Sequence, residues 1–187
     1  MVLWDRMETE VWIMITYVQG DLFKSNAQVL TNTVNTVGVM GKGVALEFKK
    51  RFPVMFEDYK RLCETGGVKP GVPYLWENDE VQILNFPTKR HWKNQSRLED
   101  IEAGLQYLAQ HYGEMGIQSL AMPPLGCGLG GLDWKDVRLL IEKYLREPLD
   151  LDVYVYEPAK ASIRTKDDET PSVSGRSSSD EWAASPV

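Results

Sequence analysis

Short apolar runs rich in β-branched and aromatic residues alternate along this chain with longer segments of helical periodicity. The first pattern predicts β-strands and the second predicts amphipathic helices. The predicted strands cover residues 13–18, 29–34, 74–76, 81–86, 119–122 and 151–156. Strands that alternate with helices bury their apolar residues by stacking in layers. The pattern therefore predicts an α/β fold, a three-layer α/β/α sandwich with a mixed central sheet.

Proline and capping residues predict where the helices begin and end. Residues 46–61 have helical periodicity that is interrupted at Pro53, which predicts two short helices meeting at this proline. Ser96 and Glu99 match a capping box, so a helix is expected to begin there. Asp133 is expected to cap the last helix, because an apolar stripe of helical spacing follows it.

The composition fits one folded domain with a different segment at each end. Hydrophobic residues make up 43% of the 187 residues and charged residues 26%, close to the usage of soluble globular proteins. Towards the C-terminus, serines and scattered charges replace the apolar periodicity, which is typical of a disordered tail. We expect an N-terminal extension at 1–13, the folded domain at 14–158 and a disordered Ser-rich tail at 159–187.

Charge, cysteine content and hydropathy exclude several classes of function. The chain has 21 Lys and Arg against 27 Asp and Glu, a formal net charge of -6, which opposes a broad electrostatic grip on nucleic acid but not a local contact. Two cysteines and two histidines give almost no material for a metal site or a disulfide framework. The apolar runs are far shorter than the roughly 20 residues of a membrane-spanning helix. We therefore expect a cytoplasmic protein without metal, cofactor or membrane contact.

Two glycine-rich segments, 38–43 and 125–131, each lie between a predicted strand and a predicted helix. Glycine lets backbone N–H groups approach a phosphate, and a helix N-terminus adds a positive dipole end. Two such loops suggest a ligand with two adjacent phosphates. Neither matches the Walker A or the dinucleotide-binding GxGxxG sequence, which disfavours ATP hydrolysis and nicotinamide chemistry. The alternative is that both loops are only tight connections.

Polar residues mark the ends of the first two predicted strands. Asp21 follows Gly20, and a carboxylate there can accept a hydrogen bond from the exocyclic amine of adenine. Its alternative role is a helix cap or a turn. Asn32 and Asn35 suit a sugar hydroxyl, and they could equally form turns.

Lys89 closely follows the strand predicted at 81–86. A lysine at a strand end beside backbone dipoles could have a lowered pKa, and its neutral amine could attack the C1 carbon of a sugar. From spacing alone, a solvated basic turn at 89–93 is the more ordinary interpretation. The same turn could hold a phosphate backbone locally while Trp92 stacks on a base.

Taken together, these segments resemble the macrodomain family of ADP-ribose-binding modules. The matching segments occur in the family's order and together span about residues 13–158; they are Ile15 to Phe23, Asn32 to Asn35, Met40 to Ala45, Asn85 to Lys89 and Pro123 to Leu129. Within the family, the strings MGKGVA, NFPTK and GCGL are similar to one branch. That branch holds the DarG antitoxins, which remove ADP-ribose from DNA, and terminal ADP-ribose protein glycohydrolase.

The resemblance implies a role for each matching residue. Lys89 matches the catalytic lysine of the branch, and Asn35 would orient the distal ribose. Asp21 and Leu22 would hold the adenine. The other ADP-ribose-binding residues that the resemblance implies are Asn32, Thr33, Val34, Gly41, Gly43, Val44, Pro124, Leu125, Gly126, Cys127, Gly128, Leu129 and Gly130.

One position departs from the protein glycohydrolase of this branch. That enzyme has an aspartate directly after its GCGL, where this chain has Gly130. The resemblance therefore favours a lysine-dependent, metal-independent ADP-ribosyl glycohydrolase that removes mono-ADP-ribose from a nucleobase, thymidine in DNA. The alternatives are release of ADP-ribose from protein glutamate, deacylation of O-acetyl-ADP-ribose, removal of phosphate from ADP-ribose 1″-phosphate, and binding without catalysis.

The resemblance also implies the partners. They are ADP-ribose or ADP-ribosylated DNA, with ADP-ribosylated protein and an ADP-ribosyltransferase toxin as further candidates. DarG resembles this chain only over its macrodomain and continues into a second domain that neutralises its toxin. A short Ser-rich tail stands in that place here, so the sequence favours the glycohydrolase role over toxin neutralisation.

Overall fold

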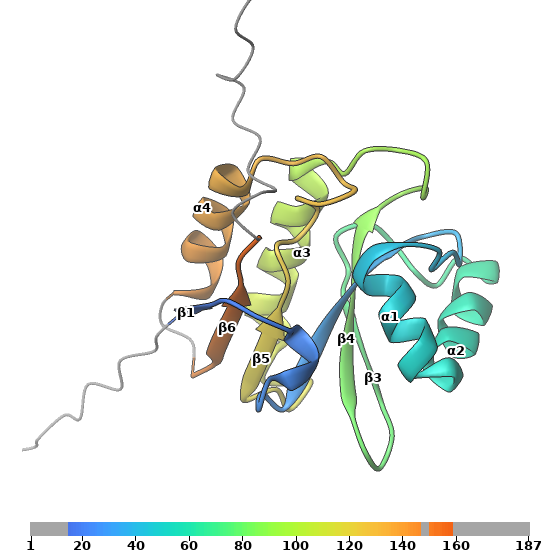
Figure 1. Cartoon of the computed structure of the whole chain (residues 1–187), viewed down its shortest axis with the longest axis horizontal. Coiled ribbons are helices and arrows are strands. Elements are labelled where there is room, and N and C mark those ends of the chain that lie inside the picture. Colours follow the sequence, from blue (N-terminus) through green and yellow to red (C-terminus); the bar gives the residue numbers. More distant parts are fainter. Residues whose placement is uncertain (1–14, 147–149, 159–187) are drawn as a thin grey trace, which may run out of the picture.

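The computed structural model describes residues 15–146 and 150–158, which fold around one six-stranded sheet (Figure 1). The strands are β1 (Ile15–Val18), β2 (Val29–Asn35), β3 (Tyr74–Glu77), β4 (Gln82–Lys89), β5 (Ser119–Met122) and β6 (Asp152–Tyr156). The helices are the 3-10 turn η1 (Leu22–Lys24), α1 (Gly43–Arg51), α2 (Pro53–Glu64), α3 (Leu98–His111) and α4 (Trp134–Leu145). The extension and the tail expected at 1–13 and 159–187 lie outside the described residues.

The sheet is mixed, as the sequence predicts. Its strand order is β1-β6-β5-β2-β4-β3. All neighbouring strands are parallel except β3, which pairs antiparallel with β4 and places Tyr74 opposite Asn85. The parallel strands therefore bring their carboxyl ends to one edge of the sheet, where α/β folds bind ligands.

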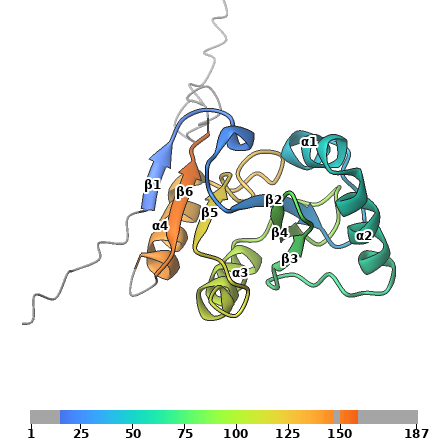
Figure 2. The ribbon, with the colours of Figure 1, turned by 90° about the horizontal axis from the view of Figure 1, so that it is seen from below.

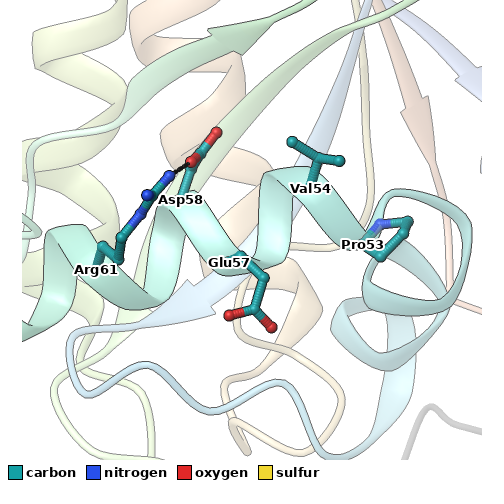
Figure 3. A pocket seen from close by; sticks show the side chains of 5 residues that line it. All are labelled: Pro53, Val54, Glu57, Asp58 and Arg61. Carbon is teal, nitrogen blue, oxygen red and sulfur yellow. Dashed lines mark hydrogen bonds and ion pairs between the residues drawn. The ribbon is translucent and has the colours of Figure 1, made fainter.

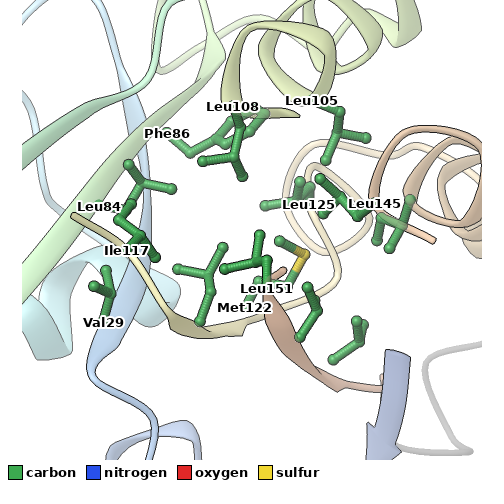
Figure 4. Close-up of a cluster of buried hydrophobic side chains, with 14 of the residues drawn as sticks. Val29, Leu84, Phe86, Leu105, Leu108, Ile117, Met122, Leu125, Leu145 and Leu151 are labelled. Atoms are coloured by element: carbon green, nitrogen blue, oxygen red, sulfur yellow. The ribbon is translucent and has the colours of Figure 1, made fainter. Parts of the chain in front are cut away.

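Helices cover both faces of the sheet, which confirms the predicted α/β/α layers (Figure 2). Neighbouring strand residues point to opposite faces: Leu84 packs in the layer of α3 and α4, and Ile83 packs in the layer of α1, α2 and η1. Figure 4 shows the first of these two layers, with Phe86 beside the leucines of α3. Burial on both faces explains why the strands read as continuous apolar runs.

The helix boundaries agree with the sequence signals at two positions and differ at a third. Pro53 is the first residue of α2, and Asp133 Oδ1 accepts a hydrogen bond of 2.8 Å from the Lys135 N–H at the start of α4. The prediction of a capping box at Ser96 is wrong, because the residue before α3 is Arg97 and no side chain caps the N-terminus of that helix. The Ser96 N–H instead donates to the carbonyl oxygen of Gly130 at 2.9 Å, which ties Ser96 to the second glycine loop.

β2 and β4 continue beyond their predicted ends. The register of the two strands shifts between Val34 and Asn35, beside Pro87, a residue that cannot donate to a strand ladder and is accommodated at bulges. The shift pairs Asn35 with Lys89 at the carboxyl edge. The two residues expected to act in catalysis are therefore neighbours across the sheet.

No helix of the described residues combines the length and the apolar composition that crossing a bilayer requires.

Candidate active site

A cavity of about 790 Å³ lies at the carboxyl edge of the sheet, and this size is typical of small-molecule sites. Its walls come from the loop between β2 and α1, the turn after β4 and the loop between β5 and α4. The loop after β2 leads to the helix layer on one face, and the loop after β5 leads to the layer on the other. The cavity therefore lies where neighbouring connections diverge, the usual ligand position in open α/β sheets.

Most of the residues expected from the sequence line this cavity. Those present are Thr33, Val34, Asn35, Gly41, Gly43, Val44, Lys89, Pro124, Gly126, Gly128, Leu129 and Gly130. The lining residues that were not expected as ADP-ribose ligands are Val39, Lys42, Ala45, Thr88, Trp92, Lys93, Ser96 and Pro123. Most of these lie on the same loops as the expected residues, so chain proximity was the available signal. Ser96 had none, because its contact with the second glycine loop is tertiary.

Three of the expected ADP-ribose ligands, Leu22, Asn32 and Leu125, have side chains that are buried in the core. Asn32 is fully buried, and its Nδ2 donates to Oδ1 of Asn85 at 3.0 Å. The strand alternation turns Asn32 towards the layer of α1 and α2, where it also contacts Met40. Leu22 and Leu125 are buried hydrophobic residues of the two layers.

Two further expected residues have side chains that bond locally. Asp21 precedes η1, and its Oδ1 accepts a hydrogen bond of 3.0 Å from the Phe23 N–H, the capping role that the sequence left open. The Cys127 thiol lies 3.5 Å from the carbonyl oxygen of Leu125, and burial raises the pKa of this thiol to about 12. Neither residue is part of the cavity wall.

Asn35 organises the first glycine loop. Its Nδ2 donates to the carbonyl oxygen of Val39 at 2.5 Å, and its Oδ1 accepts from the N–H groups of Val37 and Val39 at 3.0 and 3.3 Å. Behind it, the buried Tyr59 hydroxyl donates to the Asn35 carbonyl oxygen at 2.8 Å. The Asn35 amide therefore holds the loop as well as lining the cavity.

Lys89 joins the end of β4 to the second glycine loop. Its Nζ donates to the carbonyl oxygen of Leu129 at 2.6 Å. Partial burial lowers the pKa of Lys89 from the usual value of a lysine, because a less polar environment disfavours the ammonium form. A lowered pKa raises the fraction of neutral amine, the form that can act as a nucleophile.

The second glycine loop depends on small residues for two different reasons. Gly126 has a φ of 72°, and a Cβ there would approach Leu132 Cδ1 at 2.9 Å. Gly130 has an ordinary φ, but a Cβ there would overlap the Gly126 carbonyl oxygen and the Ser96 hydroxyl. A side chain at position 130 therefore requires the loop to move.

The cavity is positively charged although the chain as a whole is acidic. Among the described residues that line it, the ionisable side chains are Lys42, Lys89 and Lys93, and none is a carboxylate. The formal net charge of the whole chain is -6. This local excess of positive charge favours an anionic ligand. Residues 15–146 and 150–158 contain no group of three His, Cys, Asp or Glu side chains that could hold a metal ion.

A second hollow of about 340 Å³ lies on the outer side of α2 (Figure 3). It is lined by Pro53, Val54, Glu57, Asp58 and Arg61, and Asp58 and Arg61 form an ion pair. All five residues come from one helix, so no opposite wall encloses a ligand. The candidate active site is therefore the cavity at the edge of the sheet.

The Macro domain family matches this chain over residues 31–141. Together with the three-layer fold and the glycine-lined cavity, this match shows that the chain belongs to the macrodomain family. A curated relative from Mycobacterium tuberculosis (strain ATCC 25618 / H37Rv), named DNA ADP-ribosyl glycohydrolase, is 44% identical over 153 residues, which are 80% of this chain and 44% of that protein. The chain thus spans less than half the length of this relative.

Solved structures agree with this assignment. The macrodomain of Mycobacterium tuberculosis DarG is 45% identical, with a TM-score of 0.75, over 78% of this chain and 99% of that chain. Thermosipho africanus DarTG, solved in complex with ADP-ribose, is 43% identical with a TM-score of 0.73, over 76% of this chain and 41% of that chain. The chain is therefore similar to the DarG branch of the family.

Proposed function

We propose that this protein is an ADP-ribosyl glycohydrolase that removes mono-ADP-ribose from thymidine in DNA. The observation that carries the proposal is the position of Lys89, a lysine with a lowered pKa beside Asn35 in a cavity whose ionisable lining residues are all lysines. The 44% identity to a protein named DNA ADP-ribosyl glycohydrolase supports DNA as the substrate.

In the proposed reaction, the neutral Lys89 amine attacks the anomeric carbon of the distal ribose. The new C–N bond forms as the bond from that carbon to the base breaks, and the electron pair of the broken bond leaves with the base. The proton that the amine loses balances the one that the base gains. Water then attacks the same carbon as its bond to the lysine nitrogen breaks. The proton that water loses goes to the departing amine, so ADP-ribose is released and Lys89 is restored. No step requires a metal ion.

The two glycine loops would bind the diphosphate and the distal ribose. The lysines of the cavity attract the negative charge from a distance, and the backbone N–H groups of the loops can donate to it at close range. Asn35 would orient the distal ribose through the first loop, whose backbone it holds. Asp21 would bind the adenine with the carboxylate oxygen that does not cap η1.

Gly130 supports DNA over a protein substrate. An acid at this position would overlap Gly126 and Ser96, so the loop as it stands leaves no room for the aspartate of the protein glycohydrolase. In this proposal the protein acts in the cytoplasm, which suits the free thiols of Cys63 and Cys127. A partner ADP-ribosyltransferase toxin would supply the modified DNA.

The test compares the protein with its Lys89→Ala variant on thymidine-ADP-ribosylated single-stranded DNA and on glutamate-ADP-ribosylated protein. We expect release of ADP-ribose from DNA, and a loss of more than about a hundredfold in the variant because its nucleophile is gone. Lys50→Ala is the matched control, since Lys50 lies on the surface in the last turn of α1. Binding of free ADP-ribose to the Lys89→Ala variant, measured by calorimetry, shows that the cavity remains intact.

Three outcomes would contradict the proposal. Unchanged release by Lys89→Ala would exclude the lysine as the nucleophile. Release from protein alone would identify a protein deacylase. Binding of ADP-ribose without release from either substrate would indicate a protein that binds ADP-ribose without removing it from these substrates. A test with ADP-ribose 1″-phosphate would then show whether the protein is a phosphatase.

A further inference from the structure

A flat aromatic surface lies at the mouth of the cavity, three residues after Lys89. Trp92 lines the cavity and is 48% exposed. Its ring stacks on the ring of His91, with centroids 5.6 Å apart and planes inclined by 26°. A large aromatic ring exposed to this degree in the wall of an active-site cavity is suited to stacking on a planar group of a ligand.

The turn that carries this surface is fixed by bonds on both sides. Arg90 forms two hydrogen bonds with the buried carboxylate of Asp100, at 3.0 and 2.9 Å. The Thr36 hydroxyl, from the connection between β2 and α1, donates to the Arg90 carbonyl oxygen at 2.6 Å. His91 accepts the Lys93 N–H at its Nδ1, at 3.2 Å. The ring of Trp92 is thus presented by a turn that is anchored to α3 and to the loop beside it.

Positive charge accompanies the ring. Lys93 Nζ lies over the Trp92 ring, 5.0 Å from its centroid. No carboxylate within the described part of the chain pairs with Lys93. Lys42 contributes a second exposed cation from the first glycine loop. An aromatic ring with adjacent cations matches the alternation of bases and phosphates in a single-stranded nucleic acid.

We infer that Trp92 and Lys93 form a docking surface for the single strand that continues from the modified nucleotide, with a neighbouring base stacked on Trp92 and its phosphate near Lys93. This inference rests on the proposed function and adds to it the recognition of the polynucleotide chain. The Trp92 ring and the Lys93 charge at the cavity mouth would then favour an ADP-ribosylated strand over an ADP-ribosylated nucleoside.

The test measures kcat/KM for a thymidine-ADP-ribosylated oligonucleotide and for ADP-ribosylated thymidine without flanking nucleotides. We expect the ratio of the two values to fall by about tenfold in Trp92→Ala, the effect of losing one base stack. Trp92→Phe should restore most of the ratio, because it keeps an aromatic face. The controls are Leu139→Ala, which removes an exposed apolar side chain of α4, and Lys50→Gln; both should keep the wild-type ratio.

A second measurement separates this inference from the proposed function. Binding of an unmodified fluorescent single-stranded oligonucleotide is followed by anisotropy, and Trp92→Ala should weaken it by about tenfold. If the wild type releases ADP-ribose from no substrate, the proposed function fails, and this binding comparison alone decides the docking surface. Equal binding by wild type and Trp92→Ala, or an unchanged kcat/KM ratio, overturns the inference. Impaired release from ADP-ribosylated protein with an unchanged oligonucleotide ratio would assign the surface to protein and overturns it as well.

Discussion

At the scale of single residues, the proposed chemistry depends on an amine that has lost its proton. Burial lowers the pKa of Lys89, so its ammonium form becomes neutral at a lower pH than an ordinary lysine. We expect kcat to rise with pH, with a midpoint below the value of about 10.4 that is usual for lysine. A pH–rate profile under single-turnover conditions measures this midpoint. A rate that does not change with pH in this way would contradict the role of the neutral Lys89 amine as the nucleophile.

Tyr59 is predicted to position Asn35 from behind the site. Its hydroxyl donates to the Asn35 carbonyl oxygen at 2.8 Å and lies 3.1 Å from the Asn35 Oδ1. Tyr59→Phe removes this bond inside the core, so we expect a cost of about 1–2 kcal/mol in the free energy of unfolding. We also expect weaker ADP-ribose binding, because the first glycine loop loses an anchor.

Tyr74→Phe is the matched control for that variant. The Tyr74 hydroxyl is buried and has no hydrogen-bond partner in the described structure, so its removal should not lower stability. Denaturant unfolding and calorimetric titration with ADP-ribose measure both effects. Equal behaviour of the two phenylalanine variants would contradict a positioning role for Tyr59.

At the scale of elements, the second glycine loop leaves no space for a side chain at position 130. A Cβ there overlaps Gly126 and Ser96, whereas a Cβ at Gly128 has nothing within 4 Å. We expect Gly130→Ala to lower the free energy of unfolding by about 1–3 kcal/mol, the usual cost of overpacking. Gly128→Ala, which adds the same methyl group on the same loop, should be tolerated. Thermal unfolding of the two variants makes the comparison, and equal stability would show that the loop adapts.

Gly130→Asp extends this test to the chemistry. The proposed function predicts that the aspartate brings no release of ADP-ribose from protein glutamate, because the loop must move to admit it. A gain of that activity would show that the missing acid alone separates this chain from the protein glycohydrolase.

At the scale of the whole molecule, the charge distribution limits how the protein holds DNA. The chain carries a formal net charge of -6, and the cavity contributes three lysines. Because Lys89 acts as the neutral nucleophile, Lys42 and Lys93 remain to neutralise phosphates. Each such contact on a single strand contributes about -0.7 to the slope of log K against log salt, so two give about -1.4. Anisotropy titrations across salt concentrations measure the slope. Lys93→Gln should make it shallower by about 0.7, and a much steeper wild-type slope would indicate a broad DNA-binding face instead.

We also propose 14–158 as the extent of the macrodomain. The strand β6 lies between β1 and β5 in the sheet and its residues Val153 and Val155 are buried in the core, so the fold requires the chain as far as this strand. A fragment that ends before β6 should not fold, whereas a fragment of 14–158 should keep the thermal unfolding midpoint of the full chain.

The sequence by itself determined the features that depend on neighbouring residues. The alternation of strands and helices predicted the layers, Pro53 predicted the break between α1 and α2, and Asp133 predicted the cap of α4. These signals are local, because a cap, a proline or a periodic stripe acts within a few residues. Most of the cavity wall followed from the two glycine-rich loops together with the family resemblance.

Only the tertiary structure decided how these parts meet. A register shift between β2 and β4 places Asn35 opposite Lys89. Strand alternation turns the Asn32 side chain into the core. The Ser96 N–H donates to the Gly130 carbonyl oxygen in place of the predicted capping interaction. Register and loop contacts arise from hydrogen bonds between residues far apart in the sequence, so no short window of residues contains them. The same holds for Trp92, which a turn anchored to Asp100 and Thr36 presents at the mouth of the cavity.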